Sequence, residues 1–348
     1  MRAFAEWEEQ ETLLVSLPHA GTDWAPYLGE IRAAYRDFIA AAARFESVVA
    51  IAPSREDFEQ ICGGLAKASF AQIDTDDTWI RDYGAIDVEE DGKITGLNFR
   101  FNAWGGKFAS AKDDALNSKL YAASARPLRD VDLILEGGSV DFDGAGTMLT
   151  TSACLLNENR NSLSKAELDA RLREIFGLKN IIWLGHGFIK GDDTDSHVDT
   201  LARFLNPRVV AISSCDDPSD LHYAELSAMK DEISSLGYDV IELPIPRAIF
   251  YRGRRLPATY ANFVFLNGAL IVPTYADPAD PHDPNRAADE LALSRLRAAC
   301  VDREVVGVNA RVFIRQNGSL HCSCMNKFGF KFRPKEKYEN FKSWADFA

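Results

Sequence analysis

The stretch Asn262-Phe263-Val264-Phe265-Leu266-Asn267-Gly268-Ala269-Leu270-Ile271-Val272-Pro273 decides the class of fold. Two apolar runs flank Asn267-Gly268, a dipeptide typical of a two-residue hairpin turn, so an antiparallel pair of strands is predicted. Two further hairpins are predicted by the same signals. One joins 86–89 to 94–99 through Glu90-Asp91-Gly92-Lys93, and the other joins 133–142 to 147–151 through Asp143-Gly144-Ala145-Gly146.

Units in which a helix leads into a strand alternate with these hairpins. A strand is predicted at 11–16. Helical apolar spacing followed by a short β-branched run then predicts three helix–strand pairs: a helix at 28–45 with a strand at 47–52, a helix at 165–176 with a strand at 180–184, and a helix at 221–236 with a strand at 238–243. A doubly wound sheet would not need so many hairpins. The pattern therefore predicts a radial or pseudo-repeated α/β architecture, although no clean sequence repeat is present.

No Ser/Gly-rich linker divides the 348 residues. We expect one domain over residues 1–330, followed by a basic and aromatic tail at 331–348 to which the sequence assigns no role. Such a chain is long enough to bury a large core.

Composition narrows the classes of function. The net charge of −13 argues against a nucleic-acid partner, because neutralising phosphates requires clustered Lys and Arg, and it suits a cationic partner instead. No apolar run approaches the roughly 20 residues that span a bilayer, and the N-terminus does not resemble a signal peptide. We therefore expect a cytoplasmic protein without a membrane partner. Six scattered cysteines predict reduced thiols rather than a disulfide framework.

Cys322 ends the tetrapeptide Ser319-Leu320-His321-Cys322, after an apparent strand at 312–316 and Gly318. A thiol at a strand end beside a glycine loop can lie at the floor of a pocket. Attack requires the thiolate, and a nearby cation, such as a cationic substrate, lowers the thiol pKa from about 8.5. The alternative is a structural cysteine, since free Cys is among the most buried residue types. Cys324, in the same loop, serves as the structural cysteine with which Cys322 is compared.

His197 lies in the segment Gly191-Asp192-Asp193-Thr194-Asp195-Ser196-His197-Val198-Asp199. An imidazole can protonate a leaving amine and then activate water, and Asp199, two positions away, is expected on the same side of the chain. Two alternatives stay open. The oxygen-rich cluster could be a metal site, or its acids could complement the N-terminus of a helix predicted at 198–204.

Two more segments carry candidate carboxylates. Asp82 ends Trp79-Ile80-Arg81-Asp82, and a carboxylate and an indole can together hold a flat guanidinium. The alternative is a structural pair between Arg81 and Asp82 with Trp79 in the core. Glu136 follows an apolar strand predicted at 131–135 and precedes Gly137-Gly138, which would let a ligand approach the backbone closely. The alternative is that Glu136 is an ordinary acidic residue in a surface turn.

These residues occur within motifs that resemble the bacterial agmatine deiminase and peptidyl-arginine deiminase family, in the guanidine-modifying (pentein) superfamily. The matching motifs run in order from about residue 5 to residue 324. They are Asp77-Thr78-Trp79-Ile80-Arg81-Asp82-Tyr83-Gly84, Phe101-Asn102-Ala103-Trp104-Gly105-Gly106-Lys107, Glu136-Gly137-Gly138-Ser139, Leu149-Thr150-Thr151, Leu155-Leu156-Asn157-Glu158-Asn159-Arg160-Asn161, Gly191 to Asp199 with Leu201-Ala202-Arg203-Phe204, Asn262-Phe263, Val272-Pro273-Thr274-Tyr275, and His321-Cys322.

The resemblance implies a fold and a set of roles. The fold is a five-bladed pseudo-symmetric α/β propeller, forming a single catalytic domain with the site on its axis. Cys322 would be the nucleophile, His197 the general acid and base, and Asp82, Glu136 and Asp199 the groups that handle the guanidinium. The pocket would be lined by Trp79, Trp104 and Asn262. No metal and no organic cofactor would be needed, and a homodimer is expected.

The implied reaction is the hydrolytic deimination of a small cationic guanidinium substrate through a covalent amidino-cysteine. Agmatine, giving N-carbamoylputrescine and ammonia, is favoured because no obvious Arg pair awaits a substrate carboxylate, with Arg81 and Arg160 as the exceptions. One alternative is deimination of peptidyl-arginine to citrulline. The other is a non-catalytic protein that binds polyamines or guanidinium cations. The chain departs from the family pattern at Gln316-Asn317-Gly318-Ser319, where a glycine run is usual, and after Cys322.

Overall fold

The computed structural model describes residues 1–124 and 126–329, so the tail at 331–348 lies outside the described residues. Within these two ranges the strands form six sheets. Five have three or four strands, and the sixth is a ribbon of β14 (Phe250–Tyr251) and β15 (Arg254–Arg255). None of the described helices combines the length and the apolar composition required to cross a bilayer.

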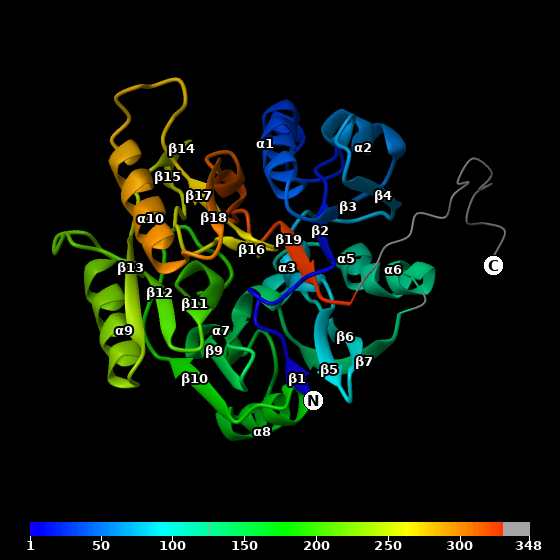
Figure 1. Cartoon of the computed structure of the whole chain (residues 1–348), viewed down its shortest axis with the longest axis horizontal. Coiled ribbons are helices and arrows are strands. Elements are labelled where there is room, and N and C mark those ends of the chain that lie inside the picture. The colour runs from blue at the N-terminus through cyan, green and yellow to red at the C-terminus, as the bar shows by residue number, and fades with distance from the viewer. Residues whose placement is uncertain (125, 330–348) are drawn as a thin grey trace.

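The five larger sheets share one strand pattern, and their labelled strands lie around the molecule in Figure 1. In each, an antiparallel pair is joined by a strand that runs parallel to the second strand of the pair. The five trios are β5 (Ile86–Glu90), β6 (Lys93–Arg100) and β7 (Leu128–Ile134); β8 (Val140–Phe142), β9 (Thr147–Thr151) and β10 (Asn180–Leu184); β11 (Ala202–Asn206), β12 (Val209–Ser214) and β13 (Asp239–Pro244); β16 (Val264–Leu266), β17 (Ala269–Thr274) and β18 (Glu304–Asn309); and β19 (Cys324–Lys327), β2 (Thr12–Ser16) and β3 (Ser47–Ala52).

Helices connect the parallel strands of each trio, because a parallel pair requires a crossover. In trio order they are α4 (Ala103–Gly106), α5 (Ala111–Asp114) and α6 (Leu116–Ser124); α7 (Ser152–Leu155) and α8 (Lys165–Phe176); α9 (Tyr223–Ser235); α10 (Asn285–Ala299); and α1 (Leu28–Ala42), which the 3₁₀ turn η1 (Ala25–Tyr27) precedes. Helix α8 carries sequence signals for both its start and its end. Ser164 and Glu167 form a capping box at its start, and Gly177 ends it at φ 68°.

The second strand and the last strand of the described chain lie in one sheet. The last strand, β19, pairs with β2, and the same sheet continues from β3 to β4 (Ala68–Gln72) after α2 (Arg55–Cys62). At the N-terminus, β1 (Arg2–Ala3) pairs with β5 of another sheet. The chain ends are therefore held in place by strands distant in sequence.

Most predicted elements are confirmed. The hairpin through Asn267-Gly268 is the pair β16 and β17, and the hairpin at 86–99 is the pair β5 and β6. The helix predicted at 165–176 is α8, and those predicted at 28–45 and 221–236 are α1 and α9, each slightly shorter.

Three predicted elements are wrong. The strand predicted at 133–142 is interrupted by η2 (Gly137–Ser139), so only Val140–Phe142 pairs with β9. The helix predicted at 198–204 is the short turn η3 (Val198–Thr200) followed by β11, because pairing with β12 overrides helical propensity there. The strand predicted at 312–316 is the 3₁₀ turn η4 (Phe313–Gln316), which packs Phe313 against Tyr35 and Phe38 of α1.

Candidate active site

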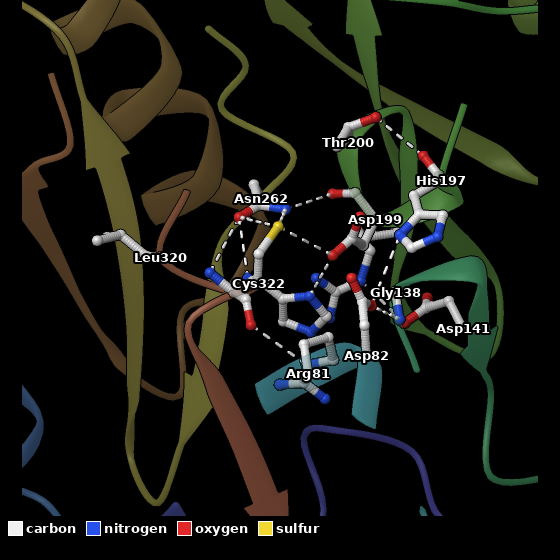
Figure 2. A network of polar contacts seen from close by, with 12 residues as sticks. Arg81, Asp82, Gly138, Asp141, His197, Asp199, Thr200, Asn262, Leu320 and Cys322 are labelled. Atoms are coloured by element: carbon white, nitrogen blue, oxygen red, sulfur yellow. Dashed lines mark hydrogen bonds and ion pairs between the residues drawn. The ribbon is translucent and has the colours of Figure 1, made fainter. Parts of the chain in front are cut away.

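The segments that enter the first strand of each trio converge on one place. Figure 2 shows Asp82, Gly138, His197, Asp199, Asn262 and Cys322 lying together, although they come from distant parts of the chain. These segments carry Asp82 in α3 (Ile80–Tyr83) before β5, Glu136 and Gly138 before β8, His197 and Asp199 before β11, Asn262 before β16, and Cys322 before β19. The structure therefore brings the five residues predicted as catalytic into one constellation.

Cys322 is 6% exposed, and its thiol lies beside an amide and a carboxylate. Asn262 donates from Nδ2 to its Sγ at 3.2 Å, and Oδ2 of Asp199 lies 3.7 Å from Sγ. Burial, together with the charges of Asp199 and Asp82, raises the pKa of Cys322 well above its ordinary value, while the Asn262 bond lowers it. Before a cation enters, this thiol is protonated.

Asp199 has a histidine as its partner. Its Oδ2 lies 2.7 Å from Nδ1 of His321, and Nε2 of the same ring lies 2.7 Å from Oε2 of Glu6. Burial raises the pKa of Asp199, but the hydrogen bond and charge of His321 outweigh it, so the pKa is lowered overall. Asp199 is therefore the ionised carboxylate nearest to the sulfur among those described.

Among the described residues, Asp82 accepts hydrogen bonds from uncharged donors only. Trp104 Nε1 donates to its Oδ2 and the backbone of Gly138 donates to its Oδ1, both at 2.9 Å. Burial, reinforced by the charges of Asp199 and Glu136, raises the pKa of Asp82 well above its usual range. The environment of Asp82 in the free protein therefore favours the protonated form of this carboxyl group.

Glu136 is paired through one oxygen and open through the other. Its Oε1 accepts from Nε of Arg160 at 2.7 Å, whereas Oε2 is buried without a hydrogen-bond partner among the described residues. Burial raises the pKa of Glu136 and Arg160 opposes that rise. Arg160 also donates to Oδ2 of Asp195 at 2.5 Å and to the carbonyl of Thr194 at 3.0 Å, so it ties Glu136 to the loop before His197.

His197 is fully buried, and neither ring nitrogen has a hydrogen-bond partner in the described part of the chain. Nδ1 lies 3.6 Å from Oδ1 of Asp82. Burial lowers the pKa of His197 to about 3, against the charge of Asp199, which raises it. The ring is therefore neutral at physiological pH and can accept a proton.

The loop that carries His197 has a strained backbone. Asp195 and Ser196 have φ of 66° and 68°, the left-handed region that non-glycine residues rarely adopt. Asp192 holds this conformation, because its oxygens accept from the backbone of Thr194 and, at 2.8 Å, of Ser196. The acids of this segment thus hold the loop, and they do not gather as a metal site. Among the described residues, Glu136, Cys154 and His197 are the one group of three close enough to hold a metal ion.

Gly138 leaves the space in which three site residues meet. A Cβ there would lie 2.7 Å from Nδ1 of His197, 2.8 Å from Oδ1 of Asp82 and 3.0 Å from Oδ2 of Asp199. Its backbone φ is unexceptional, so space rather than conformation requires glycine here.

The two predicted tryptophans lie in different surroundings. Trp104 contacts the site directly through Asp82, and its own φ is 56° within α4. Trp79 packs against Gly318, where a Cβ would lie 2.3 Å from the ring, and against Trp24, with ring centroids 5.6 Å apart. Trp79 therefore lies against the loop that leads to Cys322.

Sequence reasoning missed several partners. Arg81 does not pair with Asp82, because it donates to Oδ1 of Asn326 at 2.5 Å and lies 3.6 Å from Glu6. The pairing of Glu6 with His321 joins residues 315 positions apart, and no local pattern signals it. Arg160 lies in the motif that runs from Leu155 to Asn161, but its neighbours along the chain do not indicate that it pairs with Glu136.

Comparison with known proteins gives a consistent result. The profile of the family described as Porphyromonas-type peptidyl-arginine deiminase matches residues 2–327. The agmatine deiminase of Pseudomonas aeruginosa (strain LESB58) is 32% identical, over 91% of this chain and 93% of that protein. A substrate-bound C. jejuni agmatine deiminase structure, of a cysteine-to-serine variant, is 52% identical with a TM-score of 0.90 and covers 94% of this chain and 96% of that one. An Enterococcus faecalis agmatine deiminase is 27% identical, with a TM-score of 0.82, over 94% and 95% of the two chains. The chain therefore belongs to the family of Porphyromonas-type peptidyl-arginine deiminases.

Proposed function

We propose that this protein is a cysteine-dependent deiminase that hydrolyses agmatine to N-carbamoylputrescine and ammonia. The observation that carries the proposal is the gathering of one thiol, one neutral imidazole and three buried carboxylates. His197, Asp82 and Asp199 meet at Gly138, Cys322 adjoins Asp199, and Glu136 adjoins His197. Relatives named agmatine deiminase, at 32% identity in P. aeruginosa and 52% in C. jejuni, support agmatine as the substrate.

The three carboxylates bind the guanidinium. Guanidinium keeps its charge at any physiological pH, so it seeks ionised oxygens. Asp199 is already ionised, Glu136 offers its free Oε2, and Asp82 loses its proton when the cation arrives, because an opposite charge favours the ionised form. The carboxyl groups of the pocket thus carry their greatest negative charge when the substrate is bound.

The first half of the reaction releases ammonia. His197, neutral in the free protein, takes the thiol proton of Cys322, and the sulfur attacks the guanidinium carbon to give a neutral tetrahedral adduct. The imidazolium then returns this proton to one amino group, the carbon–nitrogen bond breaks, and ammonia leaves. A cationic amidino-thioether on Cys322 remains.

The second half uses water. His197, neutral again, takes a proton from water as its oxygen bonds to the amidino carbon. The carbon–sulfur bond then breaks, the thiolate of Cys322 is reprotonated from the imidazolium, and the product loses one proton to give the neutral ureido group. The hydrogen bond from Nδ2 of Asn262 to the sulfur stabilises the thiolate both when it attacks and when it departs.

A small substrate fits this site better than an arginine with a free carboxylate. Arg81 and Arg160, the two cations considered for that carboxylate, are buried and engaged with Asn326, Glu6, Glu136 and Asp195. Cys322, Trp79 and Trp104 are each at most 6% exposed. Access this narrow favours a free alkylguanidine over a folded polypeptide, and peptidyl-arginine is the competing substrate to be tested.

The same proposal accounts for the fold. We infer that the five trios are blades of a pseudo-symmetric five-bladed α/β propeller, and that residues 1–330 form one catalytic domain. Support comes from the common strand pattern and from the contribution of each trio to the site by the segment entering its first strand.

The decisive experiment compares substrates and traps the adduct. Purified protein is given agmatine, free arginine or a peptide with internal arginine, and ammonia and the ureido product are quantified. We expect agmatine to be preferred, and mass spectrometry after acid quenching to find an amidino adduct on the peptide containing Cys322. A folded Cys322→Ser variant that still released ammonia at a near-normal rate would overturn the mechanism, and a preference for the peptide would change the substrate.

A further inference from the structure

Cys154 lies next to two residues of the site but has no part in the proposed reaction. Ligand atoms of Cys154, Glu136 and His197 all lie within 4.8 Å of one another, and each of the three residues is fully buried. Cys154 belongs to α7, whose preceding residue Thr151 donates from Oγ1 to the carbonyl of Ser196 at 2.7 Å. The short helix is thereby tied to the loop that carries His197.

Two residues of this group have candidate ligand atoms without a hydrogen-bond partner in the described part of the chain. Oε2 of Glu136 and both ring nitrogens of His197 are buried without a hydrogen-bond partner among the described residues. A buried polar atom left without a partner costs about 1–3 kcal/mol, so a ligand that satisfies such atoms gains that free energy. Two of the three residues therefore have atoms ready to bind a ligand.

The mixture of donor atoms selects the chemical class of the ligand. A thiolate, an imidazole nitrogen and a carboxylate oxygen together suit Zn²⁺ and similar thiophilic cations, whereas Mg²⁺ and Ca²⁺ prefer oxygen alone. Zinc–ligand bonds of about 2.0–2.3 Å place tetrahedral ligands roughly 3.5 Å apart. Side-chain rotations that close the observed separations by about 1 Å would therefore complete three corners of a site and leave the fourth for water.

The surrounding charges tolerate a further cation. Arg160 lies at Oε1 of Glu136, on the other oxygen of the carboxylate, and its charge is shared with Asp195. Asp82, 3.6 Å from Nδ1 of His197, supplies an oxygen that can accept a hydrogen bond from a ring whose other nitrogen binds metal.

We propose that Glu136, Cys154 and His197 form an inhibitory site for a thiophilic divalent cation such as Zn²⁺. When the cation binds, the thiol of Cys154 loses its proton to the buffer. The cation also occupies the lone pairs with which Glu136 binds the guanidinium and His197 accepts a proton. The cation and the guanidinium need the same oxygen of Glu136, so they exclude each other. The reaction itself does not use this metal.

Direct binding is measured without substrate, so its outcome is separate from that of the proposed function. Titration of the full chain with Co²⁺ is expected to give a thiolate-to-cobalt charge-transfer band that Zn²⁺ abolishes. The band should persist in Cys322→Ser and Cys324→Ser, and disappear in Cys154→Ser and Cys154→Ala. A band that survives in both Cys154 variants and vanishes in Cys322→Ser would assign the metal to the nucleophile and overturn the proposal.

Inhibition is the second readout. Zn²⁺ should slow ammonia release competitively with agmatine, and a chelator should restore the rate. Relative to the metal-free rate of each variant, half-inhibition should require at least tenfold more Zn²⁺ in Cys154→Ser or Cys154→Ala, and an unchanged amount in Cys324→Ser. Equal sensitivity of all variants would refute the site.

Discussion

Nδ1 of His321 lies 2.7 Å from Oδ2 of Asp199, and this contact gives one of three clustered acids its own basic partner. Glu136 has Arg160 instead, and Asp82 accepts from the uncharged donors Trp104 and Gly138 alone within the part of the chain that the structure describes. Three carboxyl groups that converge on one space therefore differ in charge. Asp199 accepts a cation as an anion, Glu136 offers the oxygen that Arg160 leaves free, and the raised pKa of Asp82 favours a proton that the cation displaces.

Replacing His321 should disturb Asp199 selectively. In His321→Gln the hydrogen bond and charge that lower the pKa of Asp199 are lost, while the burial that raises it remains. We expect kcat/KM to fall about 10- to 100-fold, equivalent to about 1.4–2.7 kcal/mol, and the acidic limb of its pH profile to move to higher pH. His222→Gln, at another buried histidine paired with an acid (Asp220), is the control. An unshifted acidic limb in His321→Gln would show that Asp199 does not depend on this partner.

Arg160 can be tested for positioning separately from charge. Arg160→Lys keeps a cation but loses the fork that joins Glu136 to Asp195 and Thr194, so kcat should fall about 100-fold with little change in the pH profile. Arg160→Met also loses the charge, and because Arg160 lowers the pKa of Glu136 and His197, the profile should then move to higher pH. Steady-state kinetics across pH would distinguish the two, and wild-type kcat in both variants would contradict the positioning role.

Gly138→Ala should remove activity while retaining the fold. The added Cβ would crowd His197, Asp82 and Asp199 at 2.7–3.0 Å, so we expect kcat/KM to fall at least about 100-fold. Gly29→Ala, in α1 with no atom within 4 Å of the added Cβ, is the matched control, and should raise stability by about 0.5–1 kcal/mol without affecting activity. Full activity in Gly138→Ala would mean that the three side chains do not need that space.

His197 should make the protein sensitive to acid. Its folded pKa of about 3 lies below the unfolded value of about 6.5, so the unfolded chain binds more protons between these values and stability falls as the pH drops. At pH 5 the loss relative to neutral pH is about 2 kcal/mol. Urea unfolding at pH 7 and pH 5 should show this loss reduced in His197→Gln. Equal losses of stability in the wild-type protein and in His197→Gln would show that the ring is not buried in its neutral form.

Binding of substrate should release protons from Asp82. In Cys322→Ser, which lacks the nucleophilic thiol, agmatine should expel up to one proton near pH 7, because the cation lowers a pKa that burial raises. Calorimetric titration in buffers of different ionisation enthalpy measures this number. Adding Asp82→Asn to the same variant should abolish the release, and an unchanged value in the double variant would assign the proton to another group.

Much of the local structure follows from the sequence. The period of apolar residues, the Asn267-Gly268 turn and the capping box at Ser164 act over a few positions, so the helix at 165–176 and two hairpins were predictable. The candidate nucleophile, histidine and acids could also be named, because their chemistry depends on residue type.

Tertiary structure decided the charge state of each group, because burial and long-range partners set it. Glu6 reaches His321 across 315 positions, and Arg160 reaches Glu136 through folding of the chain rather than through any local pattern. The turns at 137–139 and 198–200 likewise replaced predicted regular elements, since close packing around Gly138 and strand pairing at 202–206 outweigh local propensity.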